Sequence, residues 1–99
     1  MTIERTTEKD SIVLVLDGEL TANTAEKLNT AIETALNETN FLVLDFTDME
    51  YVASAGLRIL LKAKKASNAK KGKFFIRNVS EDVMNVFEIT GFSDILDFL

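Results

Sequence analysis

The sequence contains no cysteine and no histidine among its 99 residues. Disulfide bonds, thiolate metal sites and imidazole metal ligands are therefore excluded, and so is a serine–histidine–acid triad. The commonest general base of enzymes is missing, so a small enzyme, as one alternative, would have to rely on lysine or a carboxylate. We accordingly expect no catalytic residues, no cofactor and no metal.

Long apolar runs are absent as well. No stretch approaches the roughly 18 apolar residues that indicate a membrane-spanning helix, and the opening MTIERTTEKD contains no apolar signal region. The lack of cysteine also fits a reducing compartment. We therefore expect a cytosolic protein that does not insert into a membrane.

Positive charge is scarce over most of the chain. The net charge is -5, which argues against direct nucleic-acid binding. Seven of the eleven basic residues fall in one stretch that contains no acidic residue. They are Arg58, Lys62, Lys64, Lys65, Lys70, Lys71 and Lys73. This stretch predicts either the solvated basic face of a helix or an electrostatic docking surface for a partner.

Proline is absent too, so turns must be made by glycine, asparagine, aspartate and serine. Runs of branched and alternating apolar residues predict strands, and apolar residues at three- and four-residue spacing predict helices. The expected strands are 2–7, 11–16, 41–46, 73–77 and a short last one at 95–99. The expected helices are about 25–37, 55–68 and 81–90, the last with Ser80 as N-cap and Gly91 as C-cap.

The resulting order, β-β-α-β-α-β-α-β, predicts a single α/β domain over residues 1–99. Right-handed crossovers would give a mainly parallel sheet of about four or five strands with an antiparallel first strand. Lys9 and Asp10 are expected to form the turn between the first two strands. Thr21 and Asn23 are both candidates for the N-cap of the first helix.

In open α/β sheets, binding sites gather beyond the carboxyl ends of the parallel strands. Three strand-to-helix junctions, 17–23, 47–54 and 77–80, are therefore expected to share one rim. The middle junction contains Ser54, between two alanines and just before Gly56. This arrangement makes Ser54 the first candidate for a functional residue.

The hydroxyl of Ser54 would meet backbone N–H groups that the first helical turn leaves without partners. The small Ala53 and Ala55 leave this hydroxyl uncovered, and Gly56 is expected to leave the backbone open on one side. Two interpretations follow: an N-cap, which contributes about 1 kcal/mol, or an approachable serine that accepts a modifying group.

Known catalytic and phosphate-binding motifs do not fit this junction. A nucleophile elbow reads G-x-S-x-G, but Val52 occupies the first glycine position and no histidine is present to activate the serine. The four glycines are scattered and match neither G-x-x-x-x-G-K-[ST] nor G-x-G-x-x-G. The residues therefore favour an acceptor or a cap over a nucleophile.

Three segments carry a resemblance to a known family. They are Gly18-Glu19-Leu20-Thr21, the central run from Val43 through Asp45 and Tyr51 to Ala53-Ser54-Ala55-Gly56-Leu57, and Thr90-Gly91-Phe92. In this order, through essentially the whole chain, they resemble the STAS domain of bacterial anti-sigma factor antagonists. This sequence departs from the family pattern at Ala53 and Thr21, where the family often has acidic residues.

The resemblance implies that Ser54 is phosphorylated by a partner that is both an anti-sigma factor and a serine kinase. The unphosphorylated form would bind that partner, the phosphorylated form would not, and a serine phosphatase would restore the first state. The resemblance and the expected rim together predict a set of partner-binding residues around Ser54. They are Thr21, Ala22, Asn23, Glu50, Tyr51, Ala53, Ser54, Ala55, Gly56, Leu57 and Arg58.

A second interpretation keeps the family but not the phosphorylation. The chain would then be a scaffolding or accessory STAS subunit of a stress-signalling or transport complex. It would dock through the rim or through the basic helix.

Overall fold

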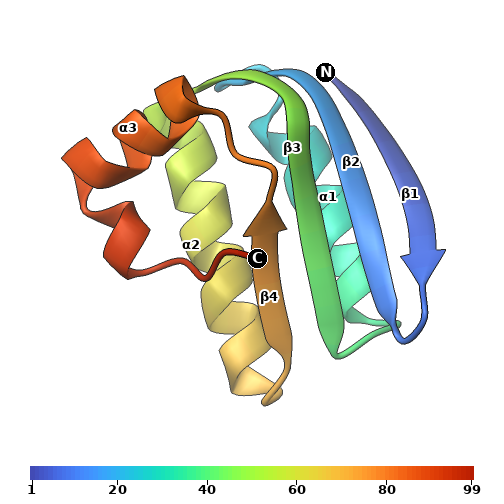
Figure 1. The fold of residues 1–99 in the computed structure, drawn as a ribbon. Helices are drawn as coiled ribbons and strands as arrows, with labels where there is room; N and C mark the ends of the chain where they lie inside the picture. Colours follow the sequence, from blue (N-terminus) through green and yellow to red (C-terminus); the bar gives the residue numbers. More distant parts are fainter.

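The computed structural model describes residues 1–99 (Figure 1). Strand β1 (Thr2–Glu8) pairs antiparallel with β2 (Ser11–Leu20), and Lys9 and Asp10 form the turn between them. Lys9 adopts a positive φ of 53°, as tight hairpin turns require. The predicted hairpin and its turn are therefore confirmed.

Strands β3 (Phe41–Val52) and β4 (Lys73–Arg77) complete a four-stranded sheet with the order β1-β2-β3-β4. Strand β3 runs parallel to both β2 and β4. The sheet is thus mainly parallel with one antiparallel edge strand, as the order of elements predicts. The nearly continuous apolar start of β3 is buried because it occupies a central position.

Helices α1 (Ala25–Leu36) and α2 (Ser54–Ala69) cover one face of the sheet, and α3 (Glu81–Thr90) lies to one side beyond β4 (Figure 1). One apolar core fills the space between the sheet and the helices. Its fully buried members include Leu14, Leu16, Leu42, Leu44, Phe46, Leu28, Ile32, Leu60 and Phe87. The rings of Phe46 and Phe87, 6.2 Å apart between centroids, attach α3 to β3.

Strands β2 and β3 are longer than the sequence pattern predicts. They do not end near Leu16 and Phe46 but continue to Leu20 and Val52. The pairing register shifts between Val15 and Asp17 and again between Gly18 and Glu19. Such bulges interrupt the two-residue alternation by which a strand is recognised, so the extensions resemble loops in the sequence.

The expected last strand, 95–99, is reduced to a single bridge. A short helical turn, η1 (Phe92–Asp94), follows α3, and Phe98 then pairs with Ile76 at the free edge of β4. The amide of Ile76 donates to the carbonyl of Asp97 at 3.0 Å. The segment therefore occupies the position of a fifth strand without forming one.

The helix caps give mixed results. Ser80 caps α3 as predicted, since its hydroxyl accepts from the amide of Val83 at 3.2 Å, and Gly91 ends the helix with a φ of 82°. The predicted caps of α1 are wrong because Thr24 is the N-cap. Its hydroxyl donates to the carbonyl of Glu19 at 2.8 Å, so it fastens the incoming loop rather than the helix. None of the helices has the length and hydropathy required to cross a bilayer.

Candidate functional site

The ends of β2 and β3 lie side by side and bring two strand-to-helix junctions together. Leu20 is in register with Val52, and the amide of Ala53 donates to the carbonyl of Leu20 at 2.8 Å. The loop into α1 and the start of α2 therefore meet at one edge of the sheet. We call this edge, formed by residues 20–24 and 50–58, the rim.

Ser54 is the first residue of α2, and its side chain is exposed. The N-cap is Ala53, whose extended backbone (φ -96°, ψ 173°) precedes the helix and whose carbonyl accepts from the amides of Gly56 and Leu57. No side chain caps this helix. The interpretation of Ser54 as an N-cap is therefore wrong, because the helix begins one residue earlier than the sequence suggests. Its hydroxyl is left without a role in folding.

Gly56 is required by packing rather than by openness. A Cβ atom at this position would lie 2.5 Å from Cγ of Leu20 and 3.2 Å from Cγ1 of Val52, and both side chains are buried. The expectation that Gly56 leaves the backbone open is therefore wrong. The glycine lets α2 approach β2 closely, and Leu57 beside it is also buried. These two residues hold the start of α2, and with it Ser54, against the sheet.

The predicted partner-binding residues divide by exposure. Six are exposed: Ala22, Asn23, Glu50, Tyr51, Ser54 and Arg58. Three are half-buried: Thr21, Ala53 and Ala55. Two, Gly56 and Leu57, are buried. The structure thus brings all of them to one rim, but only the exposed and half-buried ones present side-chain surface that a partner could touch.

Tyr51 is the most conspicuous side chain of the rim after Ser54. It is 50% exposed although it is aromatic, and it lies near the end of β3, three residues before Ser54. Aromatic side chains contribute large contact areas in protein interfaces. Tyr51 therefore offers aromatic contact area at the rim.

The third junction follows a shorter strand. Strand β4 ends at Arg77, which is in register with Asp45, whereas β3 continues past that point to Val52. Figure 1 shows the tip of β4 below the end of β3, with the chain from that tip rising to the start of α3 near the end of β3. The expectation that all three junctions share one rim therefore stays a prediction for residues 77–80.

Arg77 instead joins two carboxylates on the sheet face that no helix covers. Its Nε donates to Asp45 at 2.9 Å, and its two terminal nitrogens donate to Glu8 at 3.1 and 2.9 Å. Asp45 also accepts from Asn78 and from both the amide and the hydroxyl of Thr47. The network connects β1, β3 and β4 across the sheet.

Asp45 as a residue is only 7% exposed, and burial alone would raise the pKa of its carboxylate. Hydrogen bonds from Thr47, Arg77 and Asn78 outweigh burial and lower the pKa of Asp45 to about 2. Hydrogen bonds to Glu8 and Asp45 raise the pKa of Arg77 above its ordinary value. Both groups are therefore charged at neutral pH, and each is satisfied by the other.

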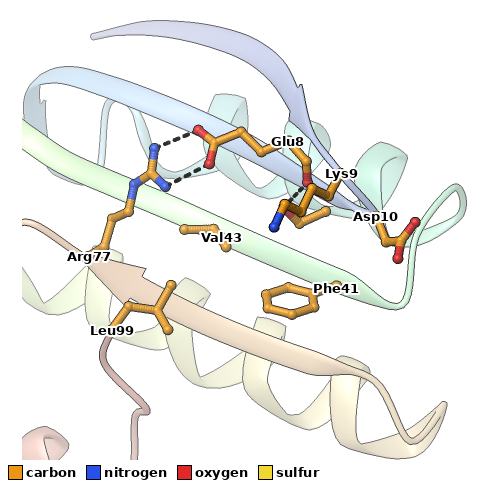
Figure 2. A pocket seen from close by; sticks show the side chains of 8 residues that line it. Glu8, Lys9, Asp10, Phe41, Val43, Arg77 and Leu99 are labelled. Atoms are coloured by element: carbon orange, nitrogen blue, oxygen red, sulfur yellow. Dashed lines mark hydrogen bonds and ion pairs between the residues drawn. The ribbon is translucent and has the colours of Figure 1, made fainter.

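A hollow of about 400 Å³ lies beside this network, lined in part by Glu8, Phe41, Val43, Arg77 and Leu99 (Figure 2). Figure 2 shows the fork of Arg77 closing on Glu8 at one end of the hollow. This network is not predicted from the sequence, although Asp45, a charged residue that follows Val43-Leu44 in an apolar strand, is a visible signal of it. No group of three or more acidic side chains is placed to hold a metal ion.

Comparison with known proteins identifies the family. A family model described as the STAS domain matches residues 2–98, so the chain belongs to the STAS domain family. Over 91 residues it is 34% identical to the anti-sigma-B factor antagonist of Listeria monocytogenes, covering 91% of this chain and 80% of that protein.

Two solved structures have the same fold. The anti-sigma factor antagonist SpoIIAA in its unphosphorylated form superposes with a TM-score of 0.76 at 19% identity, over 99% of this chain and 87% of the other. The Bacillus cell fate determinant SpoIIAA in its phosphorylated form gives 0.75 at 20% identity, over 99% and 91%. The predicted order and sheet are those of this fold.

Proposed function

We propose that this protein is an anti-sigma factor antagonist whose switch is the hydroxyl of Ser54. The unphosphorylated chain binds an anti-sigma factor that is also a serine kinase, and this binding frees a sigma factor in the cytoplasm. The kinase then phosphorylates Ser54, the complex dissociates, and a serine phosphatase restores the binding form. The chain is in this scheme a substrate and a ligand, not an enzyme.

The observation that carries the proposal is the state of Ser54. Its hydroxyl is exposed at the head of α2, caps nothing, and stands at the position that the sequence resemblance gives to the phosphorylated serine. Similarity to the Listeria antagonist, and to SpoIIAA in two phosphorylation states, supports the same role.

The position of Ser54 also explains how phosphorylation can switch binding without unfolding the domain. A phosphoserine carries about -1.5 to -2 charges at neutral pH. The first turn of α2 contains no acidic residue, so the positive end of the helix dipole is unoccupied and accepts this charge favourably. The new charge and volume would act on the partner, close to Glu50 and Tyr51 of the rim.

The test uses the serine-kinase anti-sigma factor encoded by the same organism. The chain is incubated with this kinase and ATP, and the phosphate is located by mass spectrometry. We expect a single phosphate on Ser54, none on the Ser54→Ala variant, and release of the phosphorylated chain from the kinase. Phosphate on another residue, or a phosphorylated chain that still binds fully, would contradict the proposal.

One observation favours a second candidate, an accessory STAS subunit that binds without being modified. Ala53 and Thr21, which flank the site, lack the acidic groups that the family often places there. Contacts to the kinase or its nucleotide could therefore be weaker. A partner that binds the rim but leaves Ser54 unphosphorylated in the same assay would favour this second candidate.

A further inference from the structure

The outer surface of α2 carries three cations in a line that begins at the candidate site. Arg58, Lys62 and Lys65 are all exposed. They follow Ser54 at intervals of four, four and three residues, so all four side chains lie on one side of the helix. We call Arg58, Lys62 and Lys65 the cationic stripe.

The fold makes little use of the stripe. Arg58 and Lys65 form no ion pair, and Nζ of Lys62 is 3.9 Å from the nearest carboxylate oxygen, on Glu33. The other cations of the chain are mostly engaged. Arg5 pairs with Glu38, Arg77 with Glu8 and Asp45, Lys64 with Asp97, and Lys70 donates to carbonyls at the end of α1.

The stripe is also unfavourable for the helix that carries it. Like charges three or four residues apart destabilise a helix, and α2 contains no acidic residue to relieve them. Helix α1, which is equally solvated on its outer side, mixes signs with Glu26, Lys27 and Glu33. An ordinary solvated face would resemble α1, so the uniform charge of α2 points to a binding role.

We propose that the cationic stripe is a docking surface for an acidic surface of the same kinase partner. This inference rests on the proposed function and adds a second contact to it. A partner that engages the hydroxyl of Ser54 lies at the head of α2, and the stripe extends from there along the same side of the helix. The stripe attracts acidic groups there and orients the encounter.

The same geometry links docking to phosphorylation. Arg58 is one helical turn from Ser54, a spacing at which opposite charges on a helix attract each other. A phosphate on Ser54 would therefore compete with the acidic groups of the partner for Arg58. The stripe thus gives the modification a defined target in addition to the hydroxyl that it covers.

A polyanionic nucleic acid fits the molecule less well than an acidic protein surface. The net charge is -5, and the carboxylates of Glu4, Asp17 and Asp48 line a small hollow on the uncovered sheet face. A nucleic acid extending past three cations would meet long-range repulsion from the rest of the domain. A local acidic patch on a protein avoids this repulsion.

The experiment measures association of the chain with the kinase partner at about 50 and about 300 mM salt, where screening differs strongly. The stripe variant is Arg58→Gln with Lys62→Gln and Lys65→Gln. The matched control, Lys9→Gln with Lys71→Gln and Lys73→Gln, removes the same charge from exposed positions off the stripe. Circular dichroism melting checks that both variants fold.

We expect the stripe variant to lose about tenfold in association rate at low salt and most of its salt dependence. The control should stay within about twofold of the parent. The melting temperature of the stripe variant should match or slightly exceed that of the parent, since like-charge repulsion in α2 has been removed.

Each other outcome overturns part of the scheme. A stripe variant that associates like the parent, while Ser54→Asp still abolishes binding, would overturn the stripe and leave the proposed function standing. A parent chain that does not bind the kinase overturns both. Tighter binding to a short duplex DNA than to the kinase, lost in the stripe variant, would make the stripe a nucleic-acid surface instead.

Discussion

The rim and the Asp45 network use polar side chains in opposite ways. At the network, Asp45 accepts four hydrogen bonds, and Arg77 donates to the carboxylates of both Asp45 and Glu8. The polar groups of these side chains therefore find their partners within the chain. At the rim, Ser54 has no partner and Tyr51 is half-exposed. Groups that are satisfied within the chain hold the fold, whereas groups left open are available to another molecule.

This contrast assigns different consequences to substitutions in the two regions. Changes in the network should lower the stability and leave binding to a partner intact. Changes among the exposed rim residues should do the reverse. Gly56 lies between the two cases, because it belongs to the rim but is buried against Leu20.

The largest expected effect comes from Arg77→Met. This change leaves the buried carboxylate of Asp45 without its cation, which should lower the free energy of unfolding by about 2 to 3 kcal/mol. The loss is smaller than for a fully buried ion pair because the side chain of Arg77 is 26% exposed. Urea denaturation measures the loss. Arg5→Met is the matched control, because Arg5 forms a similar fork with Glu38 at the surface and should change the stability little. Equal losses in the two variants would mean that burial of Asp45 has no energetic consequence.

Gly56→Ala should have the next largest effect. The added methyl group would meet Leu20 at 2.5 Å, and both residues are enclosed by the core. Overpacking of this kind destabilises by about 1 to 3 kcal/mol. Thermal melting measures the change. In a double-mutant cycle with Leu20→Ala, the two losses should sum to more than the loss of the double variant, because the smaller side chain at position 20 makes room for the methyl group.

Gly56 has no side chain that a partner could contact, so Gly56→Ala should affect binding to the kinase only by displacing the start of α2. If the variant melts like the parent, α2 does not need its close approach to β2. If it is destabilised but binds the kinase normally, the exact placement of the helix start is unimportant for recognition.

Acid should weaken the network by protonating Asp45. The pKa of Asp45 is lowered to about 2 from an ordinary 3.8, so its contribution is present above the ordinary pKa and is lost as the pH falls through about 4 towards 2. A shift of this size corresponds to about 2 kcal/mol. Stability measured against pH should fall in this window, and Asp45→Asn should flatten that part of the curve. A parent curve as flat as that of Asp45→Asn would show that the hydrogen bonds to Asp45 are not maintained in solution.

Much of the fold could be predicted because its signals are local. The three helices and the start of each of the first four strands follow from apolar spacing, and the caps at Ser80 and Gly91 follow from residue type. The extensions of β2 and β3 could not be predicted, because bulges break the alternation on which recognition depends. The last strand failed for another reason: its apolar residues serve a turn and one bridge.

The location of Ser54 could be predicted, but its local geometry could not. Ser54 was correctly placed at a strand-to-helix junction. The helix starts at Ser54, however, one residue earlier than predicted, and this makes Ala53 the N-cap. The spacing of apolar residues does not define a helix boundary to one residue. The role of Gly56 depends on contact with Leu20, which is distant in the sequence. The Asp45 network likewise requires the pairing of β3 with β4, which only the folded chain provides.

The smallest expected change in stability is that of Ser54→Ala, and it is the sharpest test of the comparison. Since the hydroxyl of Ser54 caps nothing, its removal should alter the free energy of unfolding by no more than about 0.5 kcal/mol. Ser54→Ala should still bind the kinase, because it resembles the unphosphorylated state, but it should never be released by ATP. Ser54→Asp should fold equally well and lose at least about 30-fold in affinity, as expected when a charge is buried unpaired in an interface. A clear loss of stability in Ser54→Ala would show that the rim, like the network, is built for the fold, and the distinction between the two regions would no longer hold.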